Sequence, residues 1–323
     1  MNTLSLPDAL LLLGRWLEST GYRFTTVTPA THARVNARHE AATARNLRDI
    51  FGWSRPFRPD LLPPDAAGWM HESGSLETLS ANGEQWRSKV RFSTLGESLY
   101  VHSAYPTQAA DAVFFGPDTY RFASLIDAEL AAQPLAAGAR ILDIGCGAGP
   151  GGMAAALTSS AMNPTLVLAD INPRALAFAR ANAALAGLTD VTFQQSDLYR
   201  ELSGKFDLIV ANPPYLVDAG ERTYRHGGGL LGSELSLRIV REGLPLLSPG
   251  GRLILYTGAP IVGGSDPFLQ AVTPLLQQAG CPFNYREIDP DVFGEELDAP
   301  AYQDADRIAV VALVARQPGG PAL

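Results

Sequence analysis

The segment Asn212-Pro213-Pro214-Tyr215 carries the most specific chemistry in this sequence. The Asn212 side-chain oxygen accepts hydrogen bonds, and the amide that enters Pro213 lacks an N–H, so Pro213 contributes only a carbonyl acceptor. Tyr215 adds a flat aromatic face with a polar tip. Two acceptors beside an aromatic plate suit a planar NH2 group, such as an amide or the exocyclic amine of a base. We therefore interpret Asn212, Pro213 and Tyr215 as catalytic, and the whole turn, including Pro214, as substrate-binding.

A short apolar strand precedes this turn. Phe206–Ala211 lacks the alternation of a half-exposed strand, which is typical of a strand covered on both faces of a parallel sheet. The two prolines end the strand, because neither can donate to a ladder. The turn is then expected past the carboxyl end of the strand, where open α/β sheets bind ligands. The alternative is an ordinary loop, because Asn-Pro and Pro-Pro are common in loops.

A glycine-rich turn follows an earlier predicted strand, Arg140–Ile144. Its glycines allow the backbone to approach a ligand closely. Asp143 lies at the end of that strand, and Asp170 follows the next strand, Thr165–Ala169, at the distance expected of an acid that binds ribose hydroxyls. The pattern predicts a nucleoside-bearing cofactor, the alternative being a tight turn whose glycines serve only packing. The glycines are Gly145, Gly147 and Gly149.

Three further residues lie in turns of the same alternating series of strands and helices. Cys146 lies within the glycine turn, and we interpret it as a small filler because no histidine flanks it. Asp197 and Leu198 follow a third predicted strand, Val191–Gln194. The later predicted elements are a helix over Pro173–Ala186, a helix over Ser233–Leu247, a strand over Arg252–Tyr256, a helix over Pro267–Ala279, and a closing antiparallel pair, Tyr285–Ile288 with Arg307–Ala315.

The first third of the chain has a different pattern. It predicts a helix over residues 5–19, a second helical stretch over His32–Phe51 and a β-hairpin over Trp86–Tyr105, hence a mixed α and β region. Gly21–Asp60 holds seven arginines against three carboxylates. This excess could contact RNA or an acidic partner, although a solvated helix face is the favoured interpretation. The histidines show no metal-ligand spacing, so no metal is expected.

The composition of the chain limits the classes of protein to which it can belong. With 323 residues, 46% hydrophobic and 18% charged, the chain is expected to form a soluble globular protein of about two domains. A net charge of −8 argues against an extended phosphate-binding surface. No apolar run approaches membrane length, and the start of the chain lacks a signal-peptide pattern. The two cysteines form no disulfide framework, which favours a cytoplasmic location.

Together the glycine turn, Asp170, Asp197 and Asn212–Tyr215 resemble a class I S-adenosylmethionine-dependent methyltransferase, over about Phe114–Ala315. The Asn-Pro-Pro-Tyr turn is similar to that of enzymes that methylate planar nitrogens, above all the release-factor glutamine N5-methyltransferases. Phe114–Tyr120 resembles that group's Pro-Asp-Thr turn, although Tyr120 stands where the group has Glu. The first 105 residues are also longer and richer in strands than its helical substrate domain.

The resemblance implies an α/β fold with a Rossmann-like seven-stranded sheet and S-adenosyl-L-methionine as cofactor. It implies that the glycine turn holds the methionine moiety, Asp170 the ribose and Asp197 the adenine amine, while Asn212 and Pro213 hold the amine that is methylated. The implied cofactor-binding set is Asp143, Gly145, Cys146, Gly147, Gly149, Asp170, Ile171, Asn172, Asp197, Leu198 and Asn212.

The expected organisation is a substrate-recognition domain over residues 1–110, a catalytic domain over 111–317 and a flexible tail over 318–323. Asp218–Gly229 could fold over the substrate or form a mobile loop. The expected acceptor is a protein glutamine, in a partner such as a release factor. The alternatives are an exocyclic base amine in RNA or DNA, a small molecule, a nicotinamide-dependent dehydrogenase, and a binding module without activity.

Overall fold

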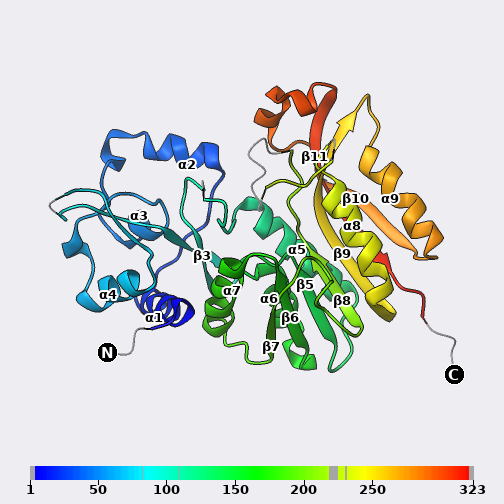
Figure 1. Ribbon diagram of the computed structural model, residues 1–323, viewed down its shortest axis with the longest axis horizontal. Helices are drawn as coiled ribbons and strands as arrows, with labels where there is room; N and C mark the ends of the chain where they lie inside the picture. Colours follow the sequence, from blue (N-terminus) through cyan, green and yellow to red (C-terminus); the bar gives the residue numbers. More distant parts are fainter. Residues whose placement is uncertain (1–3, 82, 108, 218–224, 230, 320–323) are drawn as a thin grey trace. The chain divides into compact units, whose positions relative to one another are not determined.

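The computed structural model describes residues 4–81, 83–107, 109–217, 225–229 and 231–319 (Figure 1). Its internal contacts divide the chain into two units. Unit 1 comprises Met1–Arg121, Gly147–Pro150 and Asn172–Thr189, and unit 2 comprises Phe122–Cys146, Gly151–Ile171 and Asp190–Leu323. The boundary expected after residue 110 stays a prediction.

Unit 2 is built on a seven-stranded sheet of order β10-β11-β9-β8-β5-β6-β7, which confirms the predicted α/β fold. Strands β5 to β9 pair in parallel, whereas β11 pairs antiparallel with both β9 and β10. The strands are β5 (Arg140–Ile144), β6 (Thr165–Asp170), β7 (Val191–Gln195), β8 (Phe206–Ala211), β9 (Leu247–Val262), β10 (Phe283–Asp289) and β11 (Ala305–Arg316).

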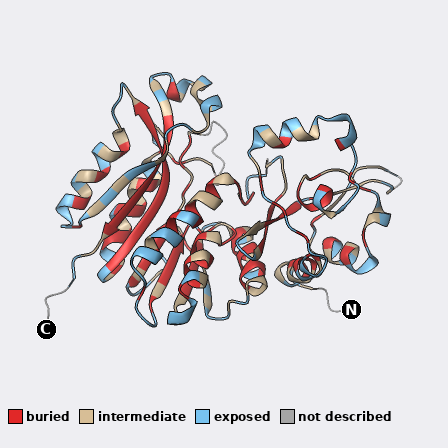
Figure 2. Cartoon of the chain, turned by 180° about the vertical axis from the view of Figure 1, so that it is seen from behind, coloured by how far each residue is buried: buried red, intermediate tan, exposed pale blue. Residues whose placement is uncertain are grey.

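Helices cover both faces of this sheet, which explains why β5 and β8 read as continuous apolar runs. Alternate residues such as Leu142 and Ile209 share one core with α8 (Glu234–Gly243) and α9 (Pro267–Gln278). The opposite face carries α6 (Pro150–Thr158) and the part of α5 (Pro117–Ala132) that belongs to unit 2. Figure 2 shows the sheet as the most continuously buried part of the chain.

Unit 1 combines helices with two small hairpins. One of them lies within the hairpin predicted over Trp86–Tyr105, whereas Trp86–Ser88 pairs instead with a strand that the sequence did not predict. Helix α1 packs against α4 and α7, and α7 packs against β4. Its core includes Leu13 of α1, Phe92 of β3 and Phe178 of α7. The elements are α1 (Leu6–Ser19), α2 (Pro29–Asn36), α3 (Leu47–Phe51), α4 (Pro64–Glu72), α7 (Pro173–Leu185), β1 (Leu76–Thr78) paired with β2 (Trp86–Ser88), and β3 (Val90–Leu95) paired with β4 (Ser98–Ser103).

The prediction of one helical stretch over His32–Phe51 is wrong. Helix α2 ends at Asn36, and α3 begins only after Asn46, whose side chain caps it by accepting from the Asp49 N–H at 3.0 Å. Arg38 between them is extended, with φ −70° and ψ 142°. A local N-cap therefore starts a new helix where the sequence shows no apolar periodicity to continue the first.

Two predicted boundaries in unit 2 also need correction. The helix predicted over Ser233–Leu247 stops at Gly243, because a 3₁₀ turn that contains Pro245 follows it. The strand predicted over Arg252–Tyr256 is the middle of the longer β9. The 3₁₀ turns are His39–Ala41, Pro59–Leu61, Ser160–Met162, Leu244–Leu246, Gly294–Asp298 and Pro300–Tyr302.

Within the described ranges, no helix is both long and apolar enough to cross a membrane. Two sequence predictions fall partly or wholly outside those ranges. Of the expected covering insert, residues 218–224 are not described, and of the expected tail, residues 320–323 are not described.

Candidate active site

The carboxyl ends of four parallel strands of unit 2 bring most of the predicted site residues to one edge of the sheet. Ile144 of β5 is in register with Ala169 of β6 and Ala211 of β8. The next residues along these strands, Gly145, Asp170 and Asn212, therefore follow at the same level of neighbouring strands. Because β6 also pairs in parallel with β7, Asp197 follows at this edge two residues after β7 ends. Ligands of open α/β sheets bind at such an edge.

The glycine turn has a backbone that glycine adopts far more readily than other residues. Gly145 in unit 2 has φ 67°, and a Cβ added there would meet nothing within 4 Å, so backbone conformation is the reason for glycine. Gly147 and Gly149 belong to unit 1 and have φ 55° and 87°. Cys146 is buried, and burial together with the nearby Asp170 and Asp143 carboxylates raises the pKa of its thiol. A protonated, buried thiol fits its interpretation as a filler.

Asp143, near the end of β5, holds the start of α6. Its buried carboxylate accepts a hydrogen bond from the Gly152 N–H at 2.7 Å. Burial raises its pKa to about 7, and the bond from Gly152 acts in the opposite direction. A Cβ on Gly152 would lie 2.7 Å from the Cβ of Asp143, so only glycine permits this contact. The shown role of Asp143 is to anchor the helix, and direct cofactor contact stays a prediction.

The residues that follow β6 provide polar and apolar surface. Asp170 is half-buried, and Ile171 is 50% exposed, the largest value among the exposed large hydrophobic residues of the described chain. Asn172 belongs to unit 1, where it caps α7 by accepting from the Arg174 N–H at 2.9 Å and donates to the Asp111 carbonyl at 2.9 Å. A carboxylate beside an exposed aliphatic side chain suits a ribose and an adjoining flat base.

The predicted adenine contact at Asp197 already has ionic partners. Its carboxylate lies 2.8 Å from Arg200 and 3.8 Å from Arg238. Leu198 is buried with φ 51°, a backbone conformation that is uncommon for a branched side chain. The Ser196 hydroxyl donates to the Leu198 carbonyl and helps to hold this conformation. Strained backbone of this kind is frequent in ligand-binding loops.

The Asn-Pro-Pro-Tyr turn is half-buried at Asn212 and Pro214 and buried at Pro213. Tyr215 is 7% exposed, and its ring lies against Gly258 of β9, where a Cβ would come within 2.3 Å of the ring. The Phe293 ring stands at its edge, with centroids 6.0 Å apart. The aromatic plate is thus fixed by packing, as a preorganised wall requires.

The segments that flank residues 218–224 support the Asn-Pro-Pro-Tyr turn. Leu216 accepts from the Gly227 N–H at 2.8 Å, and its own N–H donates to the Arg225 carbonyl at 3.2 Å. The Val217 N–H donates to the Tyr302 hydroxyl at 2.8 Å. Arg225 pairs with Glu296 of the acidic segment between β10 and β11. One carboxylate of that segment therefore has a structural ionic partner.

Two supporting residues escaped the sequence analysis. A glycine inside a strand signals close approach of another group, and Gly258 carried that signal. Asn182 of α7 carried none: it is fully buried in unit 1, accepts from the Val101 N–H at 2.7 Å and donates to the carbonyls of Val101 at 3.0 Å and Ala148 at 2.9 Å. It thereby ties the glycine turn of unit 1 to β4. Over the described residues, no three His, Cys, Asp or Glu side chains are grouped to hold a metal ion.

This sheet order, with a glycine turn and an acid at adjoining strand ends, defines an open α/β fold of the Rossmann-like methyltransferase type. Residues 123–260 match the family model of the methyltransferase small domain. These residues therefore match a methyltransferase small domain, which confirms the sequence prediction of a methyltransferase.

Named relatives match parts of the chain. It is 40% identical over 167 residues to a release factor glutamine methyltransferase of Deinococcus radiodurans, which covers 49% of this chain and 55% of that protein. It is 33% identical over 120 residues to ribosomal RNA small subunit methyltransferase C of Klebsiella pneumoniae, covering 37% and 31%. The chain thus spans about half or less of these relatives. The crystal structure of the M. jannaschii tRNA m1G37 methyltransferase aligns with TM-score 0.48, 16% identity, and coverage of 72% and 58%.

Proposed function

We propose that this chain is an S-adenosylmethionine-dependent N-methyltransferase whose acceptor is a glutamine side-chain amide of a protein, of the release-factor type. The observation that carries the proposal is the position of Asn212–Tyr215 at the carboxyl end of β8, level with Gly145 and Asp170 on neighbouring strands. The similarity to a release factor glutamine methyltransferase supports the choice of acceptor.

The residues present fit the cofactor. Gly145 adopts positive φ and leaves open space above the turn, and the half-buried Asp170 carboxylate can accept two hydroxyl hydrogen bonds. The exposed Ile171 side chain offers an apolar contact to a base. When bound, S-adenosylmethionine supplies an electrophilic methyl group. The dehydrogenase alternative has no support in the Asn-Pro-Pro-Tyr turn, because hydride transfer does not need two acceptors for an NH2 group.

The turn would act on the nitrogen that is methylated. An amide nitrogen is a poor nucleophile because its lone pair is delocalised into the carbonyl. Acceptors at Asn212 Oδ1 and the Pro213 carbonyl would bind both N–H groups, orient the lone pair for in-line attack and stabilise the positive charge that develops on nitrogen. The nitrogen loses its proton readily once the methyl group has moved, so a strong general base is not required.

Substitution of Asn212 by Ala tests this assignment. Loss of one preorganised polar contact should lower kcat by about 10²–10³, while the affinity for S-adenosylhomocysteine stays within about twofold. Asn284→Ala, at an exposed position of β10, is the matched control and should keep both values. If the Asn212→Ala enzyme methylated its acceptor protein at nearly the wild-type rate, the role of the turn would be refuted.

A base amine of RNA is the second candidate, favoured by the similarity to a ribosomal RNA methyltransferase and by exposed arginines in unit 1. Within the described residues, Arg34, Arg38 and Arg45 have no carboxylate ion-pair partner, whereas Arg55 pairs with Asp49 at 2.6 Å. Three exposed cations are few, and RNA binding usually engages more phosphates than that. Protein glutamine therefore remains the acceptor that we propose.

A further inference from the structure

Unit 1 contains a pocket of about 300 Å³, distinct in sequence from the strand-end residues of unit 2. It lies among α2, the segment around residue 55 and the segment around residue 105. Its volume is at the lower end of the range of small-ligand sites, so it suits a group of side-chain size. The described residues that line it include no carboxylate. The polar lining residues are His32, Asn36, Ser54, Arg55, Arg87 and Tyr105.

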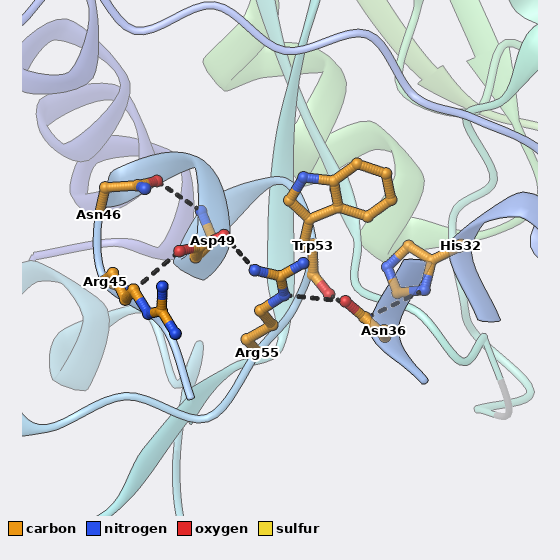
Figure 3. A network of polar contacts seen from close by, with 7 residues as sticks. All are labelled: His32, Asn36, Arg45, Asn46, Asp49, Trp53 and Arg55. Carbon is orange, nitrogen blue, oxygen red and sulfur yellow. Dashed lines mark hydrogen bonds and ion pairs between the residues drawn. The ribbon is translucent and has the colours of Figure 1, made fainter. Parts of the chain in front are cut away.

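Hydrogen bonds fix the orientation of the Asn36 amide in this pocket (Figure 3). Arg55 Nε can only donate, and it lies 2.9 Å from Asn36 Oδ1, so that atom is the acceptor. Asn36 Nδ2 must then be the donor. It donates to the Trp53 carbonyl at 2.8 Å and faces His32 Nδ1 at 3.4 Å. The Trp53 carbonyl also faces the His32 ring and acts to raise its pKa. Because that carbonyl already accepts from Asn36 Nδ2, we assign His32 Nδ1 as an acceptor without a proton.

The proton of the neutral imidazole must accordingly lie on His32 Nε2. His32 is 3% exposed. The centroid of its ring lies 4.4 Å from that of Tyr105 and 5.5 Å from that of Trp53. Burial, followed by the nearby Arg91 cation, lowers the pKa of His32 to about 4, so the ring is neutral at pH 7. In the described structure, Nε2 has no hydrogen-bond partner. A buried donor without an acceptor is costly, and a ligand oxygen would remove that cost once the side chains around Nε2 shift to admit it, because the atom is sealed from solvent here.

The charges of the pocket narrow the class of ligand. Arg55 Nη1 lies 2.6 Å from Asp49, and Arg87, whose side chain is 39% exposed, lies 3.9 Å from Glu77. Each of these two guanidiniums thus already faces one carboxylate. The nearby Arg91 guanidinium, which donates to the Thr26 hydroxyl at 2.9 Å, adds one positive charge. A phosphate group would bring almost two negative charges at pH 7 when it is monosubstituted. A carboxylate brings one, and its planar pair of oxygens matches a guanidinium edge.

We propose that this pocket binds an aspartate or glutamate side chain of the protein that is methylated, with His32 Nε2 and Arg87 donating to its carboxylate. The proposal rests on the proposed function for the origin of that side chain. The pocket would thereby act as a specificity site: it would select acceptor proteins that carry an acidic residue as well as the methylated glutamine.

Titration of the full chain tests the proposal, with capped tri-glutamate as the probe and capped tri-glutamine and inorganic phosphate as comparisons. Tri-glutamate should bind and shift the His32 Nε2 nitrogen resonance. His32→Phe, which keeps an aromatic ring beside Tyr105, and Arg87→Gln should each weaken binding about tenfold, as for loss of one hydrogen bond to a charged group. The controls His71→Phe and Arg58→Gln, at exposed positions outside the pocket, should bind like wild type.

Several results would overturn the proposal. Three of them concern the ligand: absence of tri-glutamate binding, equal binding of tri-glutamine, and tighter binding of phosphate. The fourth is unchanged affinity for tri-glutamate in Arg87→Gln. Because the Arg87 side chain is half-exposed, this variant is expected to fold like wild type. The titration with tri-glutamate contains neither methyl donor nor glutamine, so it tests the pocket independently of methyl transfer. Carboxylate binding with methyl transfer to RNA would uphold the pocket's ligand and refute the proposed function. Methyl transfer to protein glutamine without carboxylate binding would refute the pocket alone.

Discussion

Asp143 is a buried carboxyl group that joins β5 to the start of α6 through the Gly152 N–H. An acid at the end of a strand before a glycine turn predicts a place at the cofactor site, and the structure places it near the end of β5 with its carboxylate on the first turn of α6. The direction of its side chain could not be predicted, because it depends on Gly152, nine residues later, approaching closely enough to donate its N–H. Periodicity locates residues along a strand, but a hydrogen bond to another element needs the packed structure.

The raised pKa of Asp143 predicts a pH dependence of stability. The folded state holds this proton up to about pH 7 and the unfolded state only to 3.8, so between these values the folded state binds more protons. The free energy of unfolding should therefore fall as pH rises through this window, by up to about 1.4 kcal/mol per pH unit. Asp143→Asn keeps an acceptor for Gly152 and should lose this dependence. Urea unfolding at several pH values checks it, and parallel profiles for both proteins would contradict it.

At the scale of elements, β9 is longer than the strand predicted from the sequence, which ended at Tyr256. Gly258 and Pro260 disfavour a longer strand, because glycine weakens a strand interior and proline cannot donate to the ladder. The strand continues because β11 pairs with it along its length, with Val310 opposite Gly258 and Ile308 opposite Pro260. That extension is what brings Gly258 beneath Tyr215. The turn itself and its strand were predictable from local residues, whereas its support came from pairing between distant segments.

Gly258→Ala should disturb the substrate turn without touching Asn212. The added Cβ would lie 2.3 Å from the Tyr215 ring, so the ring must move. We expect a loss of about 1–3 kcal/mol in the free energy of unfolding, and a lower kcat because the wall of the site shifts. Gly294→Ala, where the Cβ meets nothing within 4 Å, should change neither. Urea unfolding and turnover assays measure both effects, and a Gly258→Ala protein equal to wild type would show that Tyr215 does not support the site.

At the scale of the whole molecule, the sequence predicted the class of fold and the order of the site motifs, because glycine and proline turns are local signals. It did not predict that Gly147–Pro150 and α7 group with the N-terminal segments in unit 1. That grouping depends on Asn182, a buried polar residue whose partners on β4 and in the glycine turn are distant in sequence. A single sequence shows no pattern for such a contact.

The charge of the molecule allows the two acceptor classes to be separated. With a net charge of −8, binding to RNA should be weak, and neutralising Arg34, Arg38 and Arg45 to Gln should leave methyl transfer to the protein acceptor unchanged. If these residues contact phosphates of single-stranded RNA, the slope of log K against log salt should flatten by about 0.7 per contact. Filter binding at several salt concentrations would reveal that flattening, which would favour the RNA alternative.

The most direct test of the central claim is to follow the methyl group itself. Cell lysate would be incubated with the protein and S-adenosylmethionine labelled in its methyl group. The labelled product would then be digested with proteases or nucleases, which leave a methylated side-chain amide intact, and identified. We predict label in protein as N5-methylglutamine, and its loss with Asn212→Ala. Label in a methylated base of RNA, in a small metabolite, or in no product at all would contradict the account.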